Sequence, residues 1–253
     1  MKNDYDKYAE ERQKKLRNGM MPSHRFVEKP MMKSMMPNLK NKKVLMLGCG
    51  TGEECDLLET FDADRKNLVG IDLSKESINI AKETYPDVEF IVGDMSNLSF
   101  KENTFDFIYS SLAIHYSSTP DKIYREVYRV LKKEGLFLFS VGHPIRWSSA
   151  HKEIEGKMYR IIGCSRDDKE SEVFGNYNTF KEYSHSFFSW GVTENLSFYV
   201  GSPSFHFKLL RKANFEVLDF TESSAIEEAK EEDINYYQKN KELPQFMAFL
   251  ARK

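Results

Sequence analysis

A glycine-rich turn at residues 48–52 constrains the fold of this chain more than any other feature. An apolar segment at 44–47 runs directly into glycines at positions 48, 50 and 52, and helix-forming residues follow. Glycine adopts positive backbone dihedral angles and carries no Cβ atom that would hold a ligand away from the main chain. The turn therefore indicates a nucleotide-binding loop between a strand and a helix, although a plain tight connection has the same pattern.

The spacing of these glycines indicates which kind of nucleotide cofactor the loop can bind. Residues 48–52 read G-x-G-x-G, whereas the dinucleotide fingerprint G-x-G-x-x-G requires a glycine at position 53 so that the helix can pack closely. This chain has Glu53 there. The loop therefore disfavours NAD.

Further apolar segments also end in polar residues. The segment at 68–71 ends at Asp72, about 20 residues after the loop, where a carboxylate can accept the hydroxyl protons of a ribose. The segment at 88–92 leads into Gly93-Asp94-Met95, and the segment at 105–109 leads into Ser110 and Ser111. Open α/β sheets bind their ligands at the carboxyl ends of the strands, so these residues are expected to share one site.

The order of these motifs resembles that of the class I S-adenosylmethionine-dependent methyltransferases. The resemblance covers most of residues 40–142 and the last fifty residues. Its motifs are LGCGTG at 47–52, GIDLS at 70–74, GDM at 93–95, FDFIYSSLAIHY at 105–116 and YREVYRVLKKEGLFLFS at 124–140. It implies S-adenosyl-L-methionine as the cofactor and S-adenosyl-L-homocysteine as the product.

The same resemblance implies the cofactor contacts. Asp72 would hold the ribose, Asp94 the adenine amine, and Met95 would stack on the adenine ring, while the glycine loop would face the methionine end. The family usually has an acidic residue where this chain has Met46, so part of the methionine contacts must come from elsewhere. The full expected set is Gly48, Cys49, Gly50, Gly52, Asp72, Leu73, Asp94, Met95 and Ser110.

The fold class expected is α/β, a Rossmann-like doubly wound sheet with helices on both faces. Helical segments at 52–61, 74–84 and 119–132 alternate with the strands, which implies parallel pairing. A fifth strand is expected at 136–141, a helix at 202–213, and strands at 215–220 and 245–251. By the resemblance, the last two strands pair antiparallel at the sheet edge and complete a mostly parallel sheet of seven strands.

We expect one methyltransferase domain over residues 1–253. Its parts are an N-terminal helical lid at 1–40, a cofactor-binding core at 41–142, an insertion at 143–201 and a C-terminal helix with a strand hairpin at 202–253. Helices at 5–17 and 24–36 either pack on the sheet or form a lid, with Tyr5 and Tyr8 in it and Arg25 near the cofactor carboxylate. The aromatic-rich insertion covers the substrate, forms a satellite core or contacts a second copy.

The implied chemistry is an in-line displacement at a methyl group on a positively charged sulfur. The protein mainly positions the reactants, and a histidine can remove a proton from an oxygen or nitrogen nucleophile. His115 follows strand four and His143 follows strand five, and His143 is preferred because Pro144 fixes its backbone. His185 and His206 are weaker candidates, and each histidine also has a structural interpretation.

Composition excludes several other classes. The net charge of −2 gives no basic field to attract nucleic acid, and three scattered cysteines form neither a disulfide framework nor a zinc site. No apolar run reaches the length of a membrane span, so we expect a cytoplasmic protein. We also expect a monomer or homodimer that acts on a small-molecule methyl acceptor. Rival interpretations are a cofactor-binding regulatory protein without transfer activity, a protein methyltransferase and an aminopropyl transferase.

Overall fold

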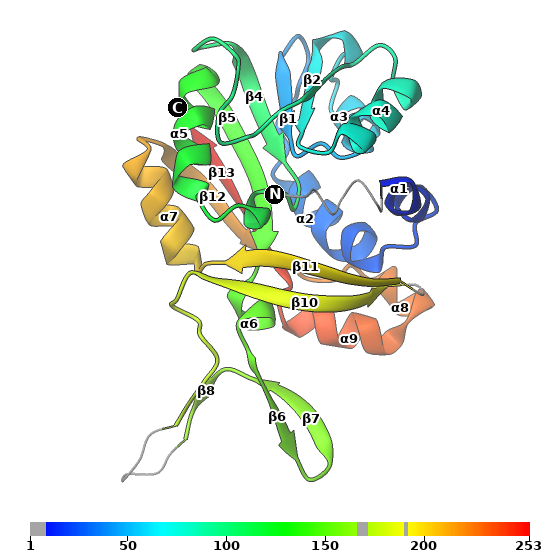
Figure 1. Ribbon diagram of the computed structural model, residues 1–253, viewed down its shortest axis with the longest axis vertical. Coiled ribbons are helices and arrows are strands. Elements are labelled where there is room, and N and C mark those ends of the chain that lie inside the picture. The colour runs from blue at the N-terminus through cyan, green and yellow to red at the C-terminus, as the bar shows by residue number, and fades with distance from the viewer. Residues whose placement is uncertain (1–8, 166–171, 190–191) are drawn as a thin grey trace.

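The structure is a computed structural model that describes residues 9–165, 172–189 and 192–253 (Figure 1). A seven-stranded sheet forms its centre. In spatial order the strands are β12 (Glu216–Glu222), β13 (Phe246–Arg252), β5 (Leu131–Gly142), β4 (Phe105–Ser110), β1 (Val44–Leu47), β2 (Leu68–Asp72) and β3 (Glu89–Val92). The strands from β5 to β3 run parallel, and β13 pairs antiparallel with both β5 and β12. The expected doubly wound sheet, with its antiparallel last strand, is confirmed.

Helices cover both faces of this sheet. Their bounds are α1 (Ala9–Arg17), η2 (His24–Glu28), α2 (Lys29–Ser34), α3 (Glu54–Glu59), η3 (Arg65–Asn67), α4 (Lys75–Thr84), η4 (Ile114–Tyr116), α5 (Pro120–Val130), α6 (Pro144–Trp147), α7 (Pro203–Lys212), α8 (Ala229–Glu232) and α9 (Ile234–Glu242). Apolar side chains of η2, α2, α3, α4 and α9 pack in one core cluster, and those of α5 and α7 pack in another. Alternation along β1 sends Val44 and Met46 to the first cluster and Leu45 and Leu47 to the second.

The N-terminal helices differ in detail from the expected pattern. The segment at 24–36 begins with a π-helical turn, η2, in which the N–H of Lys29 bonds to the carbonyl of His24, and α2 follows it. Pro30 has no N–H and its ring crowds the carbonyl four residues before it, so the wider turn accommodates the proline. Tyr5 and Tyr8, expected in a lid, lie outside the described residues.

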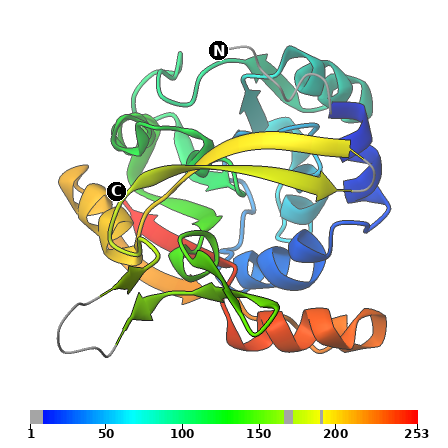
Figure 2. The ribbon, with the colours of Figure 1, turned by 60° about the horizontal axis from the view of Figure 1, so that its bottom comes forward.

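The insertion after β5 consists of antiparallel hairpins. They are β6 (Ala150–Ile154) with β7 (Lys157–Ile161), β8 (Gly163–Cys164) with β9 (Val173–Phe174), and β10 (Lys181–Ser189) with β11 (Val192–Val200). The β10–β11 hairpin crosses the molecule beside the sheet, whereas β6 and β7 project away from it (Figures 1 and 2). Within the described ranges, no helix is long and apolar enough to cross a membrane.

Candidate active site

Two adjoining cavities lie at the carboxyl ends of the parallel strands. Arg12, Gly48, Gly50 and Ser111 line both, so the two spaces share a wall. The first contains about 760 Å³ of space, part of it open to solvent. The first is also lined by Ala9, Thr51, Ile71, Asp72, Leu73, Ser77, Gly93, Met95, Leu112, Ala113 and Tyr116, and the second by Leu16, His24, Met46, Leu47, Cys49, Glu53, Glu54 and Tyr109.

The glycine loop is held against the end of β2. The N–H groups of Gly48 and Cys49 donate to the carbonyl of Ile71 at 2.8 and 3.1 Å. The N–H of Gly50 donates to the Asp72 carboxylate at 2.9 Å. All three glycines of the loop have positive φ, and a Cβ atom on Gly48 would stand 2.3 Å from the Cβ of Ala113. The loop therefore needs glycine for its backbone and for space.

The structure brings most of the expected cofactor residues together, with three exceptions. Gly52 lies behind the loop, where an added Cβ would meet the rings of Tyr85 and Phe90 at 3.0 Å. Asp94 is exposed beside the first cavity without lining it, and its carboxylate accepts from the N–H of Ser96 at 2.7 Å.

Ser110 is the third exception. Its side chain is buried, and its hydroxyl donates to the carbonyl of Leu47 at 3.1 Å, so it ties β4 to β1. Its neighbour Ser111 lines both cavities in its place. Successive side chains of a strand point to opposite faces. A prediction that is wrong by one residue therefore names a side chain on the other face, as it did for Ser110.

His143, the preferred base, is not brought to either cavity. Its ring is buried, its Nδ1 accepts a hydrogen bond from the N–H of Ile145 at 3.2 Å, and its Nε2 lies 2.8 Å from Glu222. Because Nδ1 accepts, the proton is on Nε2, which donates to the glutamate. Burial lowers the pKa of His143, and Glu222 opposes that shift. The geometry makes His143 the cap of α6 and a link between β5 and β12.

Two of the other candidate bases, His115 and His206, also line neither cavity. The ring of His115 packs 4.4 Å from that of Tyr116, and burial lowers its pKa to about 3. His206 is bonded to the Tyr124 hydroxyl at 2.6 Å, and burial lowers its pKa to about 3. His185 lies on β10, in a stretch whose side chains are outside the described part of the structure.

Arg25 likewise lies away from the position expected for it. Its guanidinium pairs with Glu232 of α8 at 2.5 Å and stacks on Phe26, and it lines neither cavity. Arg12 of α1 stands between the two cavities instead. Residues 9–17 read as a charged helix, and nothing in that pattern distinguishes Arg12 from its neighbours.

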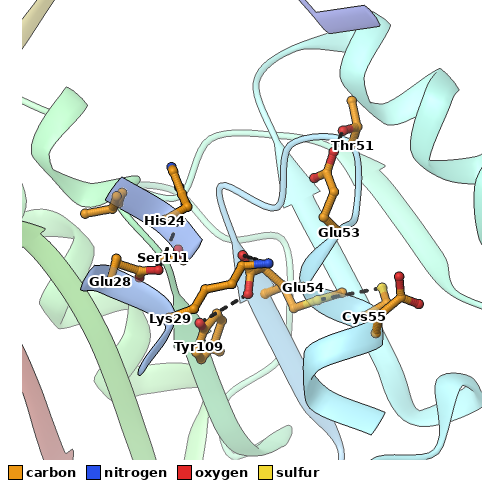
Figure 3. Close-up of polar contacts among 12 residues, drawn as sticks. His24, Glu28, Lys29, Thr51, Glu53, Glu54, Cys55, Tyr109 and Ser111 are labelled. Atoms are coloured by element: carbon orange, nitrogen blue, oxygen red, sulfur yellow. Dashed lines mark hydrogen bonds and ion pairs between the residues drawn. The ribbon is translucent and has the colours of Figure 1, made fainter. Parts of the chain in front are cut away.

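A group of buried polar residues around the second cavity had no sequence signal. Glu28 is fully buried, and its Oε1 accepts from the hydroxyls of Ser111 at 2.9 Å and Ser140 at 2.7 Å. Burial, reinforced by the charge of Glu54, raises the pKa of Glu28 to about 7. His24 lines the second cavity beside it, and burial lowers its pKa to about 3 (Figure 3).

Glu54 stands on the other side of this cavity. It accepts from the Tyr109 hydroxyl at 3.2 Å, and the Lys29 ammonium lies 3.9 Å away. Burial raises the pKa of Glu54, while the charge of Lys29 lowers it. Met46 lines the same cavity, so the buried Glu28 of η2 and the partly buried Glu54 of α3 lie around the position where an acidic residue is absent from β1.

Comparison with known proteins identifies the family. A family model described as a methyltransferase domain matches residues 45–139. A Haemophilus influenzae protein, named only as uncharacterized, is 31% identical over 187 residues, which cover 71% of this chain and 69% of that protein. The demethylmenaquinone methyltransferase of Thermotoga maritima is 38% identical over 94 residues, which cover 37% of this chain and 41% of that enzyme.

The folds agree as well. The solved structure of a Listeria monocytogenes protein described as an S-adenosylmethionine-dependent methyltransferase superposes with a TM-score of 0.71 and 25% identity. The match covers 89% of this chain and 96% of that one. Sheet order, loop motifs and relatives therefore lead to one conclusion: this chain belongs to the class I S-adenosylmethionine-dependent methyltransferases and uses S-adenosylmethionine as its cofactor.

Proposed function

We propose that this methyltransferase acts on a small-molecule acceptor held in the second cavity. The observation that supports this most strongly is the pair of adjoining cavities with Gly48, Gly50 and Ser111 in both walls. The first has the expected features of an adenosyl site, and the second is lined by ionisable and hydroxyl side chains. Reactants held in adjoining, shaped spaces gain much of their rate from orientation alone.

The residues of the first cavity fit the cofactor. Asp72 stands at the end of β2 where a ribose would bind, Met95 offers an apolar surface to a base, and the open backbone at Gly50 admits close approach. Asp94 would reach the adenine amine from the rim. Bound S-adenosylmethionine supplies a methyl group already activated by its positively charged sulfur.

We assign the methionine end to the part of the second cavity that adjoins the first. Arg12 can pair with a carboxylate there, and Glu54 with Tyr109 can accept from an ammonium group. Glu54 would then replace the acidic side chain that the family usually carries at position 46. The protein's own contribution is to bind, orient and exclude water.

The enclosure of the second cavity favours a small acceptor over a protein. Its walls come from α1, η2, β1, α3 and β4, and the His24 side chain in them is only 10% exposed. The N-terminal residues 1–40 would act as a lid, and the insertion at 143–201 would cover the acceptor. β11 packs against η4, which lies next to the first cavity.

Methyl-labelled S-adenosylmethionine tests this proposal. The protein is incubated with the label and a cellular extract, and filtration then separates small molecules from proteins. We expect label in the small-molecule fraction in step with S-adenosylhomocysteine, and no transfer with Asp72→Ala. Label in the protein fraction would indicate a protein methyltransferase, and cofactor binding without transfer would indicate a regulatory protein.

A further inference from the structure

His24 and Glu28 form a buried, incompletely paired couple beside the second cavity. They stand four residues apart on the π-helical turn η2, with His24 Nδ1 4.0 Å from Glu28 Oε2. Both atoms are buried, and neither has a hydrogen-bond partner among the described residues. Native structures rarely leave such groups unsatisfied, because a buried polar atom that has lost its water without gaining a partner is destabilising. The arrangement therefore calls for a functional reason, and π-helical turns are frequent at functional sites.

Glu28 is fixed in position by its other oxygen. The Ser111 hydroxyl of the β4 end and the Ser140 hydroxyl of β5 both donate to Oε1, which leaves Oε2 directed at the imidazole. Figure 3 shows the two side chains facing each other, with the far end of the imidazole pointing away from Glu28. Because the ring lines the second cavity, that free end is the part available to a bound molecule.

The charges around this couple keep the His24 imidazole neutral and bring the ionisation of Glu28 close to neutral pH. Glu54 of α3 and Lys29 of α2 act on Glu28, and Arg12 of α1, Lys29 and His115 of η4 act on His24. Burial and Glu54 raise the pKa of Glu28, whereas burial and the cations lower the pKa of His24. A histidine kept neutral beside an acid that ionises near neutral pH can accept a proton and be stabilised once it has done so.

We propose that His24 is the general base of methyl transfer and that Glu28 is its positioning residue. This rests on the proposed function, and it restricts the acceptor to molecules with an O–H or N–H nucleophile. The nucleophile's lone pair forms the bond to the methyl carbon, and the carbon–sulfur pair returns to sulfur. The nucleophile's proton passes to the Nε2 of His24, and Glu28 stabilises the imidazolium until solvent removes it.

The other described histidines fit this role less well. His143 and His206 already have hydrogen-bond partners, and neither lines the cavities. The Nδ1 atom of His115 is buried and has no partner in the described part of the chain, but no carboxylate faces it within ion-pair distance there. Among the histidines whose side chains the structure describes, His24 alone combines a cavity position with a facing acid.

Matched glutamine variants test the couple by activity. We expect His24→Gln to lower the transfer rate about 10²- to 10⁴-fold, the usual contribution of a general base, while the affinity for S-adenosylhomocysteine stays within about threefold. Glu28→Gln keeps an oxygen for Ser111 and Ser140, should lose less rate and should remove the acidic limb of the pH profile near pH 7. His151→Gln on the exposed β6 hairpin is the control and should transfer normally.

The possible outcomes distinguish a failure of the proposed function from a failure of the role assigned to His24. Absence of transfer by the wild-type protein contradicts the proposed function. Normal transfer by His24→Gln, or a large loss in His115→Gln with none in His24→Gln, overturns the present inference alone. Equal thermal unfolding of the variants excludes a folding defect as the cause.

An NMR titration tests the interaction of His24 with Glu28 without requiring enzymatic turnover. The carbon-bound ring protons of His24 are assigned by NMR, by comparison of the wild-type protein with His24→Gln, both bound to S-adenosylhomocysteine. We expect their shifts to change with a midpoint near pH 7 as Glu28 ionises, and the change to vanish in Glu28→Gln. Shifts that stay constant from pH 5 to 9 contradict the couple.

Discussion

The carboxylate of Asp72 accepts a hydrogen bond from the backbone N–H of Gly50 at 2.9 Å. This bond joins the end of β2 to the loop after β1, so the two strand ends that form the first cavity are held as one unit. The second carboxylate oxygen accepts from the N–H of Ser74 at 2.8 Å. Asp72 therefore shapes the first cavity as well as offering its charge to it.

Asp72→Asn should weaken S-adenosylhomocysteine binding by about 10- to 100-fold, because hydrogen bonds to charged groups contribute about 1.5–3 kcal/mol. Calorimetric titration measures this. Asp94→Asn is the matched control at the next strand end. It should lose less affinity, because Asp94 stands outside the cavity wall. A larger loss in Asp94→Asn would contradict the assignment of the ribose to Asp72.

Gly48→Ala and Gly50→Ala should differ sharply. Both residues have positive φ, which costs an alanine about 1–2 kcal/mol. At Gly48 the added Cβ also collides with Ala113, whereas at Gly50 it meets nothing within 4 Å. Overpacking adds about 1–3 kcal/mol, so urea unfolding should show the larger destabilisation in Gly48→Ala. Equal midpoints for the two variants would show that the loop is not packed as described.

His143→Gln should reduce stability and leave catalysis intact. The variant loses the cap of α6 and weakens the contact with Glu222, which together contribute about 1–2 kcal/mol. We expect a lower unfolding midpoint with transfer per folded molecule unchanged. A reduced rate at unchanged stability would return His143 to the role of base that its sequence position favours.

Glu28→Gln should change how stability depends on pH. The pKa of Glu28 rises from 4.5 to about 7 through burial, so the unfolded chain releases this proton first. The stabilisation from the neutral carboxyl is therefore complete below about pH 4.5 and is lost as the pH rises toward 7. Relative to the variant, the wild-type protein should lose on the order of 3 kcal/mol across this interval. Parallel denaturant midpoints from pH 5 to 8 would contradict a neutral, buried Glu28.

Most residues that the sequence predicts for the cofactor site line the two cavities, because their sequence signals are local. The glycine spacing, Asp72 and Met95 each follow an apolar strand directly, and parallel strands bring their carboxyl ends together. Ser110 was predicted to line the cavity, but Ser111 does so instead. Which of two neighbouring side chains faces the cavity depends on the exact end of the strand, and a single sequence fixes that position only to about one residue.

The second cavity could not be predicted for a different reason. Glu28 is bonded to residues 83 and 112 positions away, and no pattern within residues 24–36 marks it as buried. The prediction that His143 lies at the catalytic site failed for a similar reason. Its position after β5 does not show that Glu222 of β12, far along the chain, becomes its hydrogen-bond partner.

A crystal structure of the protein with S-adenosylhomocysteine would show directly whether the two cavities hold the cofactor and the acceptor. We expect the ribose hydroxyls on Asp72, the base beside Met95, and the sulfur at the boundary between the cavities, facing the space that His24 lines. Adenosine bound elsewhere, or a sulfur directed away from His24, would contradict this assignment.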